Sequence, residues 1–245
     1  MSAGESAASE AGGKDHGHGG HHGPSWLAHH FDTPAQQFDT AKLGMWAFLA
    51  QELLFFSGLF VAYGVFRSWY PEMFSAAAHQ LNREMGALNT IVLLFSSFTA
   101  AMAVRSSQLN QKTATRNYLL VTIVCAFIFL VVKYFEYAHK FHDGLLPGPF
   151  FGHQYAGIFG PIPADAHVPH LPSNAHIFFS IYFVLTGIHG LHVAIGIGVL
   201  IWILIRNERN EFSKEYFTPV DLSALYWHLV DLIWIYLFPL LYLID

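Results

Sequence analysis

Five long apolar runs constrain this chain more than any other feature of its sequence. Each run approaches or exceeds the roughly 20 residues that a helix needs to cross about 30 Å of hydrocarbon. Charged residues make up only 12% of the 245-residue chain and collect between the runs, whereas an ordinary soluble domain has about 25%. The sequence therefore predicts five transmembrane helices, at about 43–66, 86–104, 118–138, 175–205 and 222–244.

Helices, and not a barrel, are the predicted spanning elements. Only helices and closed barrels satisfy every backbone hydrogen bond in lipid. A barrel needs short segments of alternating hydrophobicity, and the sequence contains none. The predicted fold class is therefore all-α, a polytopic membrane helix bundle. The short links between most runs favour antiparallel neighbours.

Two parts are expected along the chain. Residues 1–40 are rich in His and Gly, which favours a partly disordered, solvated tail over a metal site because regular ligand spacing is missing. These forty residues contain no apolar stretch of the signal-peptide type, so we expect insertion through the first helix of the domain at 41–245. A long Gly- and Pro-rich loop at 139–174 is a candidate protein contact.

The distribution of basic residues predicts the orientation. With the N-terminus inside and the C-terminus outside, the inner side holds eight of the twelve Lys and Arg residues, the outer side three, and one lies in a span. Inner flanks normally carry this excess. The inner set is Lys14, Lys42, Arg105, Lys112, Arg116, Arg206, Arg209 and Lys214, and the outer set is Arg67, Arg83 and Lys140.

Polar residues inside the apolar runs are the candidate functional groups, because such residues are costly in a membrane and mark a pathway or a structural pairing. At 1.5 Å per residue, Glu52, His192 and Asp231 lie about 13 to 18 Å from the inner edge, which predicts a shared polar layer. The full set is Gln51, Glu52, Lys133, Glu136, His176, His189, His192, His228 and Asp231.

Each of these groups has a structural interpretation and a functional one. His228 and Asp231 share a helix face at i and i+3, as a hydrogen-bonded core pair or a proton relay, and the core pair is favoured. Lys133 and Glu136 are one turn apart and are expected to pair. Glu52 is a lone carboxyl among apolar neighbours, so it is a proton-handling candidate or a satisfied structural group.

The histidines of the fourth run lie among glycines 187, 190, 196 and 198, which favours close helix packing with the His189 and His192 rings as inter-helix hydrogen-bond donors. A haem-binding alternative would use His176 and His189, but the fifth run offers only His228 as a partner. The single cysteine, Cys125, excludes an internal disulfide framework. Convergent metal-ligand spacing is also missing, so no metal site is predicted.

Five motifs occur together and in order: LGMWAFLAQELLFFSGLF (43–60), LNTIVLLFSSFT (88–99), KYFEYAH (133–139), YFVLTGIHGLHVAIG (182–196) and ALYWHLVDLIWIYLF (224–238). With them the chain resembles subunit III of the haem-copper terminal oxidases, the cytochrome c oxidase and quinol oxidase family. The resemblance covers almost everything from Leu43 onward, and each motif places a polar residue inside an apolar span.

The resemblance implies a non-catalytic accessory subunit of a proton-pumping, oxygen-reducing oxidase in a prokaryotic inner membrane. It implies that haem and copper lie in partner subunits, with a catalytic subunit I, a subunit II and a small subunit IV as companions. It also implies phospholipid bound in a cleft between helices, support for proton uptake, and protection of the catalytic subunit from inactivation during turnover.

Site residues also follow from the resemblance. The proton-handling or buried carboxyl candidates are Glu52, Glu136 and Asp231. The expected structural polar network is Gln51, His189, His192 and His228, and Arg206 is the candidate for a lipid headgroup. Three departures from the family are visible. The long outer loop at 139–174 is atypical for the family. Longer members have seven spans, so the lipid cleft here would lose a wall or be completed by another subunit, and Asp221 stands where the family has a Glu.

Two alternatives stay open at the level of sequence. An accessory subunit of a quinol oxidase or a nitric oxide reductase would share these helices. An independent membrane haem-binding or transport protein would work without companions. The net charge of -5 gives no sign of the basic face that nucleic-acid binding requires.

Overall fold

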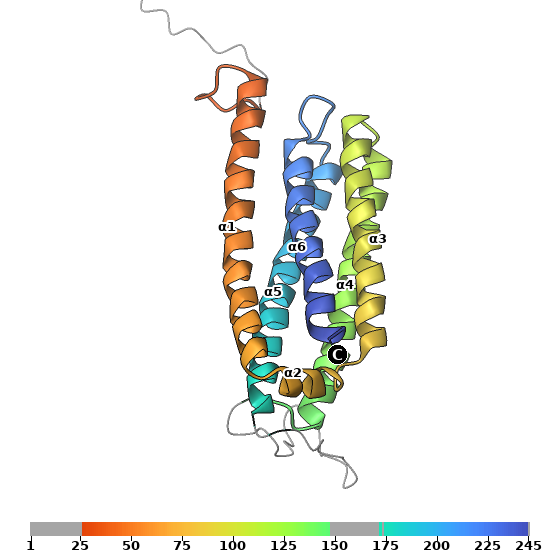
Figure 1. The fold of residues 1–245 in the computed structure, drawn as a ribbon. Coiled ribbons are helices and arrows are strands. Elements are labelled where there is room, and N and C mark those ends of the chain that lie inside the picture. Colours follow the sequence, from red (N-terminus) through yellow and green to blue (C-terminus); the bar gives the residue numbers. More distant parts are fainter. Residues whose placement is uncertain (1–25, 148–171, 173, 245) are drawn as a thin grey trace, which may run out of the picture.

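The computed structural model describes residues 26–147, 172 and 174–244, and these residues form six α-helices and no strand (Figure 1). Most of the His-rich tail and of the long loop before the fourth span therefore lies outside the described residues, and the expectations for them stay predictions. The helices are α1 (Pro34–Trp69), α2 (Pro71–Ala78), α3 (Arg83–Gln108), α4 (Lys112–His142), α5 (Ala175–Glu208) and α6 (Thr218–Tyr242).

Five of the six helices are long and apolar enough to cross a membrane, which confirms the predicted all-α bundle with five spans. The five run side by side along one axis, and α2 lies across one end of them (Figure 1). We call this end the α2 end. The opposite end, which carries the link between α5 and α6 at 209–217, is called the loop end.

The helices extend beyond the apolar runs, and α1 shows why. It begins at Pro34, nine residues before the run, because Thr33 caps it: the Thr33 hydroxyl accepts a hydrogen bond from the Gln36 backbone N–H. Proline at the first helical position favours the same start. Hydropathy alone detects the part of a helix that lies in lipid and misses polar turns of this kind.

Helix α2 was not expected from the sequence, since its eight residues are too short to give a hydropathy signal. It begins at Pro71 and buries Met73, Phe74, Ala77 and Ala78 against the bundle. The Phe74 ring packs edge-to-face on Phe178 of α5 at 5.4 Å. Helix α2 thus covers the end of the bundle at which α5 begins.

Small and hydroxyl-bearing residues join α3 to α4. Thr99 and Thr122 are 2.8 Å apart between their hydroxyl oxygens, and Ser106 and Thr115 are 2.9 Å apart. Ala100 is 1% exposed beside them. Membrane helices approach closely through such residues because lipid supplies no hydrophobic force between them.

Helix α6 contacts α1, α3 and α5 and carries the two largest buried side chains. Trp227 donates to the Ser96 hydroxyl at 3.0 Å, and Trp234 donates to the Thr90 hydroxyl at 3.1 Å. Both bonds fix α6 against α3 and pair the indole N–H groups of these two buried tryptophans. Most of the core therefore depends on the placement of α6.

Only one glycine of the fourth span permits close contact with the tryptophans. A Cβ added at Gly196 would lie 2.8 Å from the Trp227 ring, whereas one added at Gly190 or at Gly198 would meet nothing within 4 Å. At Gly187 the nearest atom, the Tyr137 hydroxyl, is 3.8 Å away. The expectation that all four glycines serve helix packing therefore holds for Gly196 alone.

We expect Gly196→Ala to destabilise the bundle by about 1–3 kcal/mol, because the rigid Trp227 ring cannot move away without separating α5 from α6. Gly190→Ala on the same helix is the matched control. It gains helix propensity of about 1 kcal/mol and creates no clash. Thermal unfolding in detergent measures both, and equal midpoints for the two variants would contradict the packing role of Gly196.

Candidate functional site

Glu52 of α1 and His192 of α5 form a pair inside the bundle. The Glu52 Oε2 and His192 Nε2 atoms are 2.9 Å apart, and each side chain is 14% exposed. The Phe56 ring packs against the imidazole at 5.2 Å between ring centroids. Glu52 is therefore not the lone carboxyl that the sequence suggested.

The second ring nitrogen of His192 defines the protonation of this pair. His192 Nδ1 lies 2.9 Å from the Ile188 backbone carbonyl oxygen, which can only accept a hydrogen bond. Nδ1 must therefore carry a proton. The Glu52–His192 contact then contains one shared proton, either on the carboxyl of a neutral pair or on Nε2 of an ion pair. Such an arrangement can take up or release a proton without a change of partners.

Helix α6 completes the surroundings of His192. The Tyr226 hydroxyl donates to the His192 backbone carbonyl at 3.0 Å. This bond brings α6 to the same point at which α1 and α5 meet through Glu52 and His192. The expected polar layer is thus partly confirmed, since Glu52 and His192 are in contact, while Asp231 lies elsewhere in the bundle.

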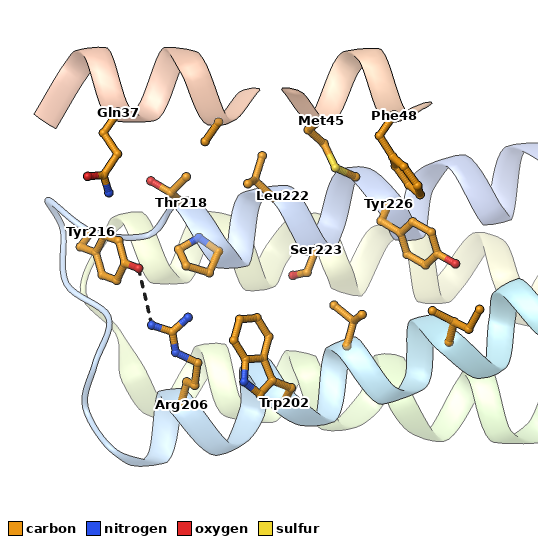
Figure 2. Close-up of a pocket in the computed structure, with 14 residues that line it drawn as sticks. Gln37, Met45, Phe48, Trp202, Arg206, Tyr216, Thr218, Leu222, Ser223 and Tyr226 are labelled. Carbon is orange, nitrogen blue, oxygen red and sulfur yellow. Dashed lines mark hydrogen bonds between the residues drawn. The ribbon is translucent and has the colours of Figure 1, made fainter. Parts of the chain in front are cut away.

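An apolar groove of about 560 Å³ begins beside Tyr226 and runs between α1, α5 and α6 to Arg206 (Figure 2). Ile195 and Arg206 both line it, so it extends over eleven residues of α5, or about 16 Å. Its volume lies in the range of small-molecule sites. The walls are mostly apolar, and the polar residues gather at the loop end, where Gln37, Arg206, Tyr216 and Thr218 lie.

Arg206 is held in a fixed position at this end of the groove. Its Nε donates to the Glu211 carboxylate at 2.6 Å, and one terminal nitrogen donates to the Tyr216 hydroxyl at 3.5 Å. The guanidinium also stacks over Trp202 and Phe212, at 4.8 and 5.3 Å from the ring centroids. The remaining N–H groups suit an anionic oxygen, because a guanidinium has five donors in a planar array.

A separate buried charge cluster lies near the α2 end. Lys133 Nζ is 2.9 Å from Glu136 Oε2, which confirms the predicted pairing. Lys133 also donates to the Tyr242 hydroxyl at 2.9 Å, and Tyr182 and Tyr242 donate to Glu136 Oε1 at 3.0 and 2.5 Å. The two charged residues are only 7% and 2% exposed. Each charge is fully paired, so this cluster joins α4, α5 and α6 and offers no free group for chemistry.

The expected pair of His228 and Asp231 is not formed. His228 Nδ1 instead contacts the Ser97 hydroxyl of α3 at 2.7 Å. The Asp231 carboxyl is buried without a hydrogen bond of normal geometry, although Ser97 lies near enough to interact with it. The two side chains share a helix face, and the nearest polar group on that face belongs to α3.

Two further members of the expected polar network need correction. His189 is fully buried, and neither of its ring nitrogens has a hydrogen-bond partner among the described residues. Its ring lies 5.5 Å from Phe129 and 5.3 Å from Trp234, so it packs among aromatic side chains. Gln51 is exposed on α1 and makes no hydrogen bond within the described part of the chain. Of the two histidines of the HGLHV motif, only His192 is an inter-helix partner.

The fold and the site together define a polytopic helical membrane protein whose helices are joined by paired polar side chains inside the bundle. Within the described ranges, no group of three or more His, Cys, Asp or Glu side chains could hold a metal ion.

Comparison with known proteins points to one family. A family model described as cytochrome c oxidase subunit III matches residues 170–245. The probable cytochrome c oxidase subunit 3 of Nocardia farcinica is 29% identical over 208 residues, or 83% of this chain and 87% of that protein. Subunit 3 of Synechocystis sp. is 28% identical over 233 residues, or 95% of this chain and 81% of the relative. The chain is therefore similar over most of its length to cytochrome c oxidase subunit III proteins, which agrees with the resemblance seen in its motifs.

The groove and the Glu52–His192 contact were not identified from the sequence. The sequence places Glu52 and His192 at similar depths in the membrane, but similar depth does not show which helices are neighbours. No sequence pattern located the groove, because lining residues such as Met45, Ile195 and Leu222 look like ordinary residues of apolar spans. Arg206 and Tyr226 lie at its two ends because α5 and α6 are antiparallel.

Removing one partner of the Lys133–Glu136 cluster should cost more than removing both. Lys133→Met leaves the buried Glu136 carboxylate without its counter-ion, which costs about 3–5 kcal/mol, while Lys133→Met with Glu136→Leu removes both charges together. We expect the double variant to unfold at a higher temperature than Lys133→Met. Lys112→Met on the same helix is the control, because Lys112 is exposed. If the changes in stability caused by Lys133→Met and Glu136→Leu simply add up in the double variant, the two side chains do not interact as a pair.

Proposed function

We propose that this chain is the accessory subunit III of a proton-pumping cytochrome c oxidase in a prokaryotic inner membrane. Similarity to the family and the five spans support association with other oxidase subunits. In this proposal subunit I carries the haem and copper chemistry, subunit II and a small subunit IV complete the complex, and this chain stabilises subunit I. The loop end, with its excess of basic residues, faces the inside of the cell.

The observation that carries the functional part of the proposal is the 2.9 Å contact between Glu52 Oε2 and His192 Nε2. A single proton on a partly buried acid–imidazole contact can be exchanged at little cost, because either group can hold it. We propose that the pair buffers protons near subunit I and so supports proton uptake. In contrast, the Glu136 carboxylate accepts hydrogen bonds from Lys133 and two tyrosine hydroxyls, so Glu136 has a structural role.

The groove supports the second part of the proposal, which is lipid binding. An apolar channel about 16 Å long with an arginine at one end suits an acyl chain and an anionic headgroup oxygen. It lies between α1 and the pair α5 and α6, so its walls come from three helices that this chain has. A lipid seated there would pack from Arg206 to Tyr226, beside the Glu52–His192 pair.

Companion subunits test the proposal as a whole. Purification in mild detergent through a tag on this chain should retain two larger chains with a-type or o-type haem in a reduced-minus-oxidised spectrum. No haem should stay with this chain after it is stripped from them. A b-type spectrum from the isolated 27.5 kDa chain would instead establish an independent haem protein.

Glu52→Gln tests the proton-handling role. Glutamine can still hydrogen-bond His192 Nε2, so assembly should be unaffected, but the contact loses its exchangeable acid proton. We expect a severalfold lower rate of proton uptake and faster inactivation during turnover of the assembled oxidase. Gln51→Leu is the matched control, because the neighbouring Gln51 is exposed and makes no hydrogen bond within the described residues. Unchanged turnover, pumping and lifetime in Glu52→Gln would leave the pair with a structural role only.

A further inference from the structure

A short segment precedes α1 at the loop end of the bundle. We call residues 26–33 the strap. One side chain of α1 holds its backbone at two points: Ala28 N–H donates to Gln37 Oε1 at 2.9 Å, and Gln37 Nε2 donates to the Trp26 carbonyl at 3.4 Å. Asp32 N–H also donates to Gln36 Oε1 at 2.9 Å. The strap is thus folded back on the first turn of α1.

The strap contacts the residues that hold Arg206. The Trp26 ring stacks on Tyr216, with centroids 5.0 Å apart and an angle of 21° between the planes. The other end of the Tyr216 side chain accepts the hydrogen bond from Arg206, which Figure 2 shows at the loop end of the groove. Trp26, Tyr216 and Arg206 therefore form one continuous row from the strap to the groove.

The strap lies behind the end of the groove and not inside it. A second hollow of about 190 Å³ is lined by Trp26 and Phe38, and it shares Gln37 and Thr218 with the groove. These shared residues, with Tyr216, separate the two spaces. Without Trp26, Tyr216 would lose the ring against which it packs, and the groove would open toward the strap.

We propose that the strap supports the end wall of the groove, which Gln37, Tyr216 and Thr218 form: by holding Gln37 and Tyr216, it positions Arg206 for the headgroup of a phospholipid and slows the lipid's exit. This inference rests on the lipid groove proposed above. The occupant has an apolar chain directed toward Tyr226 and a phosphate at the polar end, because the polar side chains of the groove are concentrated there. Trp26 is a positioning residue, since it acts through Tyr216.

Lipid exchange in the assembled oxidase tests the end wall. The complex is placed in vesicles of phosphatidylethanolamine and phosphatidylglycerol, and the release of a labelled phospholipid is followed over time. The Arg206→Met complex identifies the lipid that binds in the groove. It is the phospholipid that the unaltered complex retains and this variant loses. We expect Trp26→Ala and Gln37→Leu to release this lipid roughly three to ten times faster, the range for loss of one aromatic stack.

Two conservative variants separate positioning from general damage. Trp26→Phe keeps an aromatic ring on Tyr216 and should restore slow exchange. Tyr216→Phe keeps the stack but removes the hydroxyl that accepts from Arg206, so it should exchange faster. Trp46→Ala is the control, because Trp46 is 59% exposed on α1 and does not line the groove. The haem spectrum of each complex verifies assembly.

The outcomes distinguish this inference from the proposal beneath it. Equal lipid retention in the unaltered complex and in Arg206→Met would overturn the lipid groove itself. If Arg206→Met loses the lipid but the Trp26→Ala complex exchanges lipid at the same rate as the unaltered complex, only the role of the strap at the end of the groove is overturned. Faster exchange in Trp46→Ala as well would show a general loosening of α1 and would also overturn it.

Discussion

The fold depends on the requirement that polar groups placed in hydrocarbon find partners inside the protein. Lys133 and Glu136 meet it most completely, with a direct ion pair and two tyrosine hydroxyls drawn from α5 and α6. Trp227 and Trp234 meet it by donating to hydroxyls of α3. These contacts determine which helices lie together, because dispersion and hydrogen bonds, and not hydrophobic force, select neighbours within lipid.

The Glu52–His192 pair differs from the Lys133–Glu136 cluster in ways that bear on function. Both join helices, but Glu136 accepts from three donors, whereas the bond between Glu52 and His192 contains a single proton that either group can hold. Glu52 and His192 also lie beside a groove that reaches the loop end of the bundle. The two pairs therefore differ in their hydrogen-bond environments, and this difference is the basis for proposing different roles for them.

Sequence motifs gave the family resemblance and most of the polar residues, but not their partners. The YWHLVD motif was interpreted as a pair between His228 and Asp231, and His228 instead contacts Ser97, a residue of the second span. His189 was expected to donate to a neighbouring helix, and it packs between aromatic rings. In both cases spacing along one helix gave the correct face and the wrong contact, because a face is a local property and its partner is supplied by another helix.

The sequence by itself determined the number of spans and the all-α class, since the length and polarity of each segment decide whether it can cross a bilayer. Its motifs gave the resemblance to subunit III. It also determined the Lys133–Glu136 pair, which requires only one turn of helix. The tertiary structure alone decided that Glu52 meets His192, that Arg206 and Tyr226 line one groove, and that Trp26 stacks on Tyr216. These contacts join residues far apart in the chain, so they depend on helix packing, which hydropathy does not encode.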